Sequence, residues 1–112
     1  RAAIGGNTIG DIGYAIESFV NNKYGIVRDL AGHGVGKEIH EDPYVPNYGK
    51  KGQGAKLMPG MIIAIEPMLC LGTHHIEVDD DDWTIRTRDG KNSAHFEHSI
   101  LITKNKPEIL TK

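Results

Sequence analysis

The sequence has one cysteine, almost no net charge and no long hydrophobic run. Because Cys70 is the only cysteine in 112 residues, a disulfide framework is excluded, and we expect a reducing, cytoplasmic setting. A formal net charge of −2 gives no strong attraction to nucleic acid or to an anionic membrane. No stretch approaches the ~18 apolar residues of a membrane span. We therefore expect neither nucleic acid nor a membrane among its partners.

What remains is an ordinary globular composition. Hydrophobic residues make up 38% of the chain, and counting the 14 glycines as apolar brings the share to the usual range of roughly 45–50%. A chain of this length is one domain or part of one, and it can bury roughly two thirds of its unfolded surface. The first residues, from Arg1, read as the middle of a domain, so we expect a processed chain or a piece of a longer protein.

One amphipathic helix is predicted over residues 8–23. Its apolar positions fall along one stripe: Ile9, Ile12, Ile16, Phe19 and Val20. Asn7 or Thr8 caps its beginning, and Asp11 completes an imperfect capping box with Thr8. Gly25 is expected to provide the left-handed residue that ends the helix.

The rest of the chain predicts loops and antiparallel strands. Residues 32–60 are mostly loop, which we expect to be ordered by its embedded apolar residues. Residues 61–71 form an apolar run, broken at Glu66-Pro67, that suits a strand buried on both faces. Further strands are predicted at 75–78, 83–87, 94–103 and 108–110. The Asp79–Asp82 segment lacks the pattern of a calcium loop and predicts an exposed acidic turn.

Three separated residues, His33, Glu66 and Glu97, carry most of the chemical information. An imidazole and two carboxylates are the donors expected of a site for Co²⁺, Mn²⁺, Fe²⁺ or Zn²⁺. Taken one at a time, each has a plainer interpretation. His33 could be a turn histidine in solvent, Glu66 could belong to a buried ion pair or a half-exposed strand end, and Glu97 could lie on a solvent-facing stripe. His40 follows His33 by seven residues and could serve proton transfer or be a surface histidine.

The contexts of the two glutamates favour a pocket. Burying an unpaired carboxylate within an apolar run costs several kcal/mol, and Pro67 interrupts the strand, so Glu66 can point into a cavity at that break. Strand alternation over 94–103 places His95 and Glu97 on one face. Together with Glu66 they would form a compact polar pocket.

Seven short motifs in one order cover nearly the whole chain. They are Gly-His-Gly-Val-Gly at 32–36, His-Glu-Asp-Pro at 40–43, Pro-Asn-Tyr-Gly at 46–49, Pro-Gly-Met at 59–61, Ile-Glu-Pro-Met at 65–68, Asp-Trp-Thr at 82–84 and Phe-Glu-His-Ser at 96–99. The chain thereby resembles the type I methionine aminopeptidases of the pita-bread metallopeptidase family. The sequence after Glu97 resembles that branch more than the prolidases and aminopeptidases P, whose last glutamate usually stands in Ile-Glu-Asp.

The resemblance implies a fold and an activity. The fold is α+β, with residues 1–112 as the C-terminal half of the pita-bread catalytic domain, containing one N-terminal helix and a curved, mainly antiparallel sheet. The activity is metal-dependent removal of the initiator methionine from the N-termini of nascent chains. The complete enzyme would use two divalent metal ions, drawn from Co, Mn, Fe or Zn.

It also implies roles for individual residues. His33, Glu66 and Glu97 match metal ligands, with Glu97 bridging both ions. Glu66 and His40 are the catalytic residues: Glu66 moves the proton of the attacking water, and His40 hydrogen-bonds the scissile peptide. Three residues would contact substrate beside His40: Trp83 in the methionine pocket, Ile39 next to it, and His95, at a place where some members have glutamine.

The match leaves ligands unaccounted for. Members of the family have two further aspartate ligands, and neither Asp11 nor Asp29 of this chain can be matched to them. We therefore expect the isolated chain to be inactive unless the missing N-terminal half of the domain is supplied. The alternatives are a non-catalytic binding module of this fold, a prolidase-like or aminopeptidase P-like peptidase, and a homodimer that pairs through the exposed half-sheet.

Overall fold

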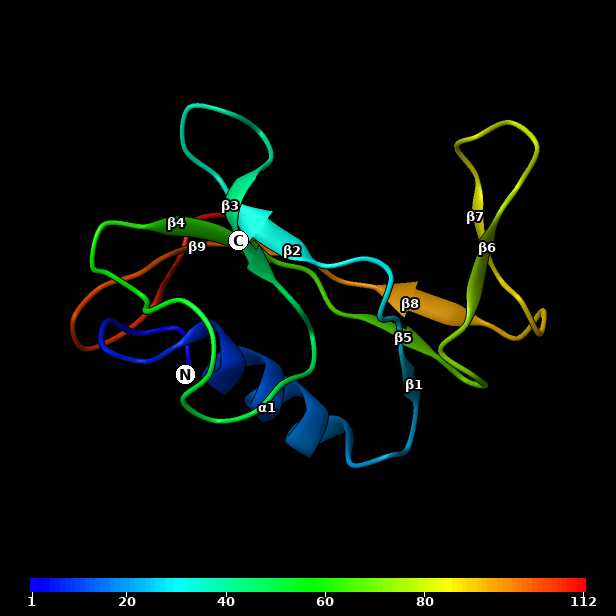
Figure 1. Ribbon diagram of the computed structural model, residues 1–112, viewed down its shortest axis with the longest axis horizontal. Coiled ribbons are helices and arrows are strands. Elements are labelled where there is room, and N and C mark those ends of the chain that lie inside the picture. Colours follow the sequence, from blue (N-terminus) through cyan, green and yellow to red (C-terminus); the bar gives the residue numbers. More distant parts are fainter.

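One helix and ten short strands make up the chain, which a computed structural model describes over residues 1–112 (Figure 1). In chain order these are α1 (Ile9–Val20), β1 (Gly25–Ile26), β2 (Gly32–Gly34), β3 (Glu41–Val45), β4 (Ile62–Ile65), β5 (Met68–Cys70), β6 (Ile76–Val78), β7 (Ile85–Thr87), β8 (Ser93–His95), β9 (His98–Leu101) and β10 (Glu108–Ile109). No helix is both long and apolar enough to cross a bilayer.

The strands form two antiparallel sheets and a hairpin. The five-stranded sheet has the order β10-β9-β4-β2-β3, the three-stranded sheet has the order β1-β5-β8, and β6 pairs with β7. In Figure 1 the β6–β7 hairpin stands apart at one end of the molecule, and α1 lies along one side of the sheets. These features confirm the predicted α+β class with one N-terminal helix and mainly antiparallel strands.

The two sheets are joined by a pair of facing breaks. The chain passes from β4 to β5 through Glu66-Pro67, and from β8 to β9 through Phe96-Glu97. Register places Ile65 opposite His98 on one side of the breaks, while Met68 lies opposite His95 on the other. Residues 66–67 therefore lie across from 96–97, and Phe96 N–H donates to the Pro67 carbonyl at 3.1 Å.

The break at Glu66-Pro67 was predicted, whereas the break at Phe96-Glu97 was not. The single strand predicted over 94–103 is wrong, because β8 and β9 belong to different sheets. The strand alternation expected for His95 and Glu97 therefore does not run through this segment. The predicted hairpin around Asp79–Asp82 and the last strand are confirmed by β6–β7 and β10.

The helix begins as predicted and ends differently. Thr8 and Asp11 form a full capping box, in which each side chain accepts from the other residue's backbone N–H. The helix stops at Asn21, whose φ of 48° is left-handed, and Gly25 instead opens β1. Phe19 departs from the predicted apolar stripe, since its side chain is 90% exposed.

The core lies between α1 and the five-stranded sheet. It contains eight buried residues: Ala3, Ile9, Ile12, Val45, Leu57, Ile63, Ile100 and Ile102. Burial of each large aliphatic side chain stabilises the fold by about 1.5–3 kcal/mol. A methyl group on Gly13 would meet the Tyr48 carbonyl oxygen at 2.1 Å, so the helix approaches the 46–49 loop closely enough to require glycine there. A second cluster, Val27, Met68 and Cys70, lies at the three-stranded sheet.

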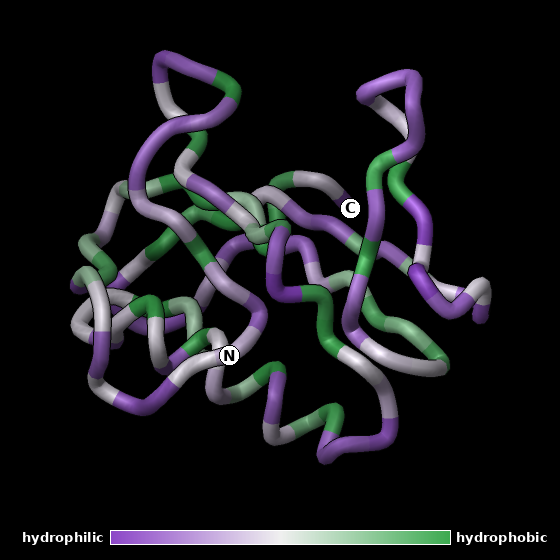
Figure 2. Tube along the Cα trace, turned by 45° about the vertical axis from the view of Figure 1, so that its right-hand side comes forward, coloured by the Kyte–Doolittle hydropathy of each residue, from purple (hydrophilic) through white to green (hydrophobic).

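Residues 32–60 are more structured than predicted, because they contain β2 and β3. Among the apolar residues expected to order this segment, Val45 is fully buried, whereas Ile39 and Tyr44 are exposed. Figure 2 shows that the loop between β2 and β3 projects from the same side of the molecule as the β6–β7 turn, and that both are mostly hydrophilic.

Candidate metal centre

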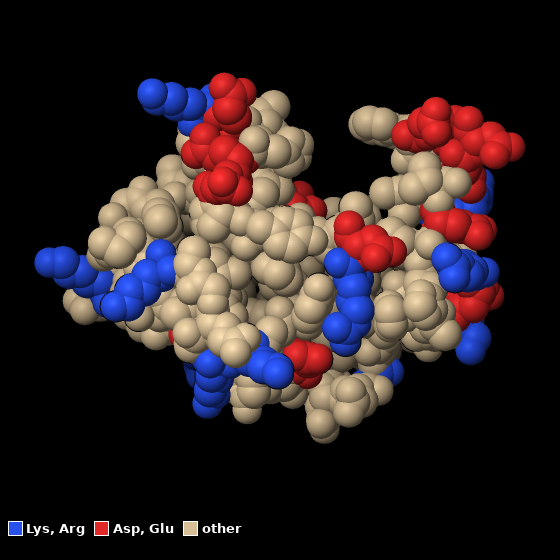
Figure 3. Space-filling model, in the orientation of Figure 1, with Lys and Arg blue, Asp and Glu red and all other residues tan.

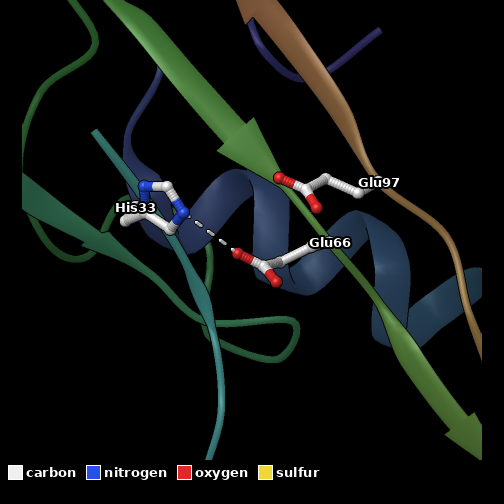
Figure 4. Close-up of side chains that lie close together, drawn as sticks. All are labelled: His33, Glu66 and Glu97. Atoms are coloured by element: carbon white, nitrogen blue, oxygen red, sulfur yellow. Dashed lines mark ion pairs between the residues drawn. The ribbon is translucent and has the colours of Figure 1, made fainter. Parts of the chain in front are cut away.

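Three side chains with metal-binding donors meet beside the breaks that join the two sheets. His33 lies on β2, Glu66 follows β4 directly, and Glu97 lies between β8 and β9. One ligand atom from each lies within 4.8 Å of the others (Figure 4). The sheet order explains this convergence: His33 pairs with Ala64 on β4, and the break containing Glu97 faces the break containing Glu66.

The His33 ring is oriented so that one nitrogen faces Glu66. Its Nδ1 is 2.9 Å from the Gly34 carbonyl oxygen, which can only accept a hydrogen bond, so Nδ1 carries the proton. In the neutral ring Nε2 then has a lone pair, and it lies 3.3 Å from Glu66 Oε1. A lone pair facing a carboxylate oxygen is favourable only with a proton or a metal ion between them. A backbone carbonyl on the other ring nitrogen is the usual support of a metal-binding histidine.

The spacing of these atoms fits a metal ion. Ligand bonds of about 2.0–2.2 Å to two donors that are 3.3 Å apart subtend an angle of about 100–110° at the ion. The His33 and Glu66 side chains are only 16% and 14% exposed, so water competes poorly for them. Glu97 is exposed and supplies the third donor from the solvent side. One imidazole with two carboxylates suits Mn²⁺, Fe²⁺, Co²⁺ or Zn²⁺.

A cavity of about 460 Å³ opens beside this cluster. Its polar end contains His33, His40, Glu66 and His95. The remaining lining residues are mostly apolar: Val27, Leu30, Ala31, Met68, Cys70, Ile76, Ile85, Arg86, Thr87, Ser93 and Ala94. The cavity can therefore hold a ligand that has a polar group at one end and an apolar side chain at the other.

Cys70 contributes to the cavity as a packed apolar group. The side chain is buried and unpaired. Burial raises the pKa of the Cys70 thiol, and the nearby Asp89 carboxylate raises it further. The thiol therefore stays protonated near neutral pH and is a poor nucleophile.

Two further predicted site residues lie at the same end of the cavity. The His40 ring, just before β3, is centred 4.3 Å from the His33 ring at an angle of 59°. His95, the last residue of β8, has Nε2 at 3.3 Å from Glu66 Oε2. The structure thus brings together all three predicted ligands, His40 and His95.

The structure does not bring Trp83 and Ile39 to this cavity. Their side chains are 85% and 76% exposed. Trp83 lies in the β6–β7 turn, where its backbone N–H donates to Asp81 Oδ1, and Ile39 lies on the projecting loop before β3. The residues that do form the apolar wall, above all Met68 and the two hairpin isoleucines Ile76 and Ile85, were not predicted from the sequence. In β5 the side chains of Met68 and Cys70 are both buried on one face of the strand. This period-2 pattern is the sequence signal that could have identified part of the apolar wall.

The acidic turn is explained by its own hydrogen bonds. Figure 3 shows acidic side chains gathered on the two projecting loops. Asp81 accepts from the Thr84 hydroxyl and from the N–H groups of Thr84 and Trp83, and these bonds lower the pKa of Asp81. The Asp81 carboxylate is therefore satisfied without a cation.

Comparison with known proteins adds the family context. The profile of metallopeptidase family M24 matches residues 1–104. A methionine aminopeptidase of Clostridium acetobutylicum is 51% identical over 110 residues, which cover 97% of this chain and 44% of that protein. Methionine aminopeptidase 1 of Bacillus subtilis is 45% identical over 108 residues, which cover 96% of this chain and 44% of that protein. This chain therefore spans less than half the length of these relatives.

Solved structures separate the branches of this family. A methionine aminopeptidase from Thermotoga maritima superimposes with a TM-score of 0.94 at 49% identity, covering 97% of this chain and 44% of that one. A prolidase from Pyrococcus horikoshii gives a TM-score of 0.66 at 30% identity, covering 99% of this chain and 26% of that one. The chain is thus more similar to this methionine aminopeptidase than to this prolidase in both sequence and shape.

Proposed function

The chain belongs to metallopeptidase family M24, and from this premise we propose that it provides metal ligands, a proton-transfer group and a substrate pocket to an enzyme that removes N-terminal methionine. The observation that carries the proposal is the convergence of His33, Glu66 and Glu97 beside a cavity whose lining is mostly apolar. The methionine aminopeptidases that are 45–51% identical to this chain give the reaction class.

Each residue at the site has a part in this proposal. Bound divalent ions would polarise the peptide carbonyl and lower the pKa of water. His33, Glu66 and Glu97 would hold them, each offering at least one donor atom to the shared position. Glu66, which lines the cavity, would take the proton of the attacking water and return it to the leaving amine.

The remaining cavity residues would select and orient the peptide. His40 lies beside His33 and can donate a hydrogen bond to the scissile peptide. The apolar wall, which includes Met68, Ile76 and Ile85, would receive the methionine side chain. A cytoplasmic setting, where nascent N-termini occur, is part of the proposal and agrees with the single unpaired Cys70.

Three donors cannot fill the coordination of two ions. We therefore propose that full activity needs further ligands beyond those in these 112 residues, and that two ions drawn from Mn, Fe, Co or Zn are used. The 112-residue chain alone should bind a divalent ion weakly and show no measurable release of methionine from a Met-Ala-Ser peptide. Robust turnover by the purified chain would contradict this ligand count.

A chimera tests the function directly. The 112 residues would replace the matching segment of the Clostridium acetobutylicum enzyme, and methionine release from Met-Ala-Ser would be measured with Co²⁺ or Mn²⁺. We expect an active chimera, and we expect Glu66→Gln to lower kcat by about 10²–10⁴-fold, the usual worth of a general acid–base group. Glu77→Gln, on the exposed face of β6, is the matched control and should retain activity.

Other results would favour the alternatives. A folded chimera that binds Mn²⁺ but releases no methionine would indicate a non-catalytic module. Cleavage of Xaa-Pro dipeptides in place of Met-Ala-Ser would indicate the prolidase branch.

A further inference from the structure

His95 holds an unusual position for a half-exposed side chain on an edge strand. It ends β8, which pairs only with β5, and its register partner is Met68, two residues after Glu66. Its side chain is 49% exposed, and Nε2 is 3.3 Å from Glu66 Oε2. His33 Nε2 lies at the same distance from the other oxygen, Oε1. The Glu66 carboxylate therefore has one imidazole at each oxygen.

Glu66 needs such support because of where it lies. It occupies the break between β4 and β5, so it is not itself part of a strand ladder. Its main chain is held by Asn47, a fully buried residue whose Nδ2 donates to the Glu66 carbonyl oxygen at 3.2 Å. That contact fixes the backbone and leaves the side-chain torsions free. A carboxylate that can rotate presents either oxygen, or both, to a metal ion.

We propose that His95 is a positioning residue: its Nε2–H donates to Glu66 Oε2 and keeps Oε1 at the metal position shared with His33 and Glu97. A hydrogen bond to the second oxygen of a metal-binding carboxylate is the kind of outer contact whose loss typically lowers metal affinity by about 10–100-fold. The inference rests on the proposed function, because it requires that Glu66 bind a metal ion.

The test compares substitutions that keep or remove the donor. His95→Gln retains an N–H donor at a similar reach, whereas His95→Phe keeps a ring and loses the donor. His75→Phe is the matched control, since His75 is an exposed histidine that does not line the cavity. Mn²⁺ binding to the 112-residue chain would be followed by the electron paramagnetic resonance signal of free Mn²⁺, and the stability of the metal-free chain by urea unfolding.

We expect His95→Phe to raise the Kd for Mn²⁺ by about 10-fold or more, while His95→Gln and His75→Phe stay within about twofold of the unsubstituted chain. The urea midpoints of all the metal-free chains should agree, which separates positioning from a purely structural role.

Three results would overturn the inference. An unchanged Kd in His95→Phe would show that the contact does not act on the metal. An equal loss in His95→Gln and His95→Phe would show that the imidazole is itself a ligand or that the site tolerates no change there. If the unsubstituted chain binds no Mn²⁺, or if Glu66→Gln does not weaken that binding, the proposed metal site fails along with the inference. The first two results, in contrast, count against the role of His95 and leave the proposed metal site standing.

Discussion

At the scale of residues, the candidate metal centre depends on contacts that a linear sequence shows only in part. His33, Glu66 and Glu97 could be selected because a histidine between glycines and glutamates in apolar runs are chemically conspicuous. The orientation of the His33 ring toward Glu66 could not be predicted from the sequence, because it depends on one hydrogen bond to the Gly34 carbonyl. The apolar wall was missed for a related reason, since Met68 and Ile85 meet only in the folded chain.

Asn47 gives a prediction at this scale. The side chain is fully buried, its Nδ2 holds the Glu66 carbonyl, and its Oδ1 has no hydrogen-bond partner. Asn47→Ala removes the Nδ2 donor and leaves the Glu66 carbonyl oxygen without this hydrogen bond. The free energy of unfolding should therefore fall by about 1–3 kcal/mol. Urea unfolding of the metal-free chain measures this. The exposed Asn105→Ala is the control, and equal stability of the two variants would contradict the assigned contact.

At the scale of elements, local signals were predictive and long-range pairing was not. The capping box of α1 followed from Thr8 and Asp11 because it joins residues three apart. The break at Glu66-Pro67 followed from proline, which cannot continue a sheet ladder. The break at Phe96-Glu97 has no such residue, because it is set by β8 pairing with β5 while β9 pairs with β4. The stop at Asn21 was missed because glycine is the commoner left-handed residue.

The helix cap gives two predictions at this scale. The first concerns Thr8, whose hydroxyl oxygen accepts from the Asp11 backbone N–H. Thr8→Ala should lower the free energy of unfolding by about 1 kcal/mol, as is typical of a lost N-cap. Thr73→Ala is a comparison outside the helix, since the Thr73 contact to Asp89 uses its backbone N–H. A change in Thr8→Ala no larger than in Thr73→Ala would contradict the cap.

The second prediction concerns the stability of the chain at low pH. Hydrogen bonds from the backbone N–H groups of Thr8 and Gly52 lower the pKa of Asp11 below its ordinary 3.8. A lowered carboxyl pKa stabilises the fold above about pH 3.8, and that contribution is lost as the pH falls through the lower folded value. Asp11→Asn lacks this contribution. Its difference in urea midpoint from the unsubstituted chain should therefore shrink as the pH falls below about 3.8, and a constant difference would contradict the assignment.

At the scale of the whole molecule, the chain has a small core and a wide exposed surface. Only 18 of 112 residues are buried, and the radius of gyration is 14.3 Å, against roughly 13 Å for a typical domain of this length. Large apolar side chains such as Phe19, Trp83 and Phe96 are exposed. With a small core, ligand binding should contribute visibly to stability.

Metal binding should therefore stabilise the chain measurably. At a free Mn²⁺ concentration of about 100 times Kd, the free energy of unfolding should rise by about 2.7 kcal/mol. Glu97→Gln removes one of the three donors, so the same Mn²⁺ concentration should give a smaller rise, while Glu108→Gln on β10 should behave like the unsubstituted chain. Urea titrations with and without Mn²⁺ measure the difference. Equal stabilisation of the two variants would place the ion elsewhere.

The most direct measurement is an anomalous-scattering map from a crystal of the chain soaked in Mn²⁺. We expect a peak about 2.0–2.3 Å from His33 Nε2, Glu66 Oε1 and one Glu97 carboxylate oxygen. A map without that peak, or with manganese only at the acidic turn Asp79–Asp82, would contradict the metal centre on which the proposed function depends.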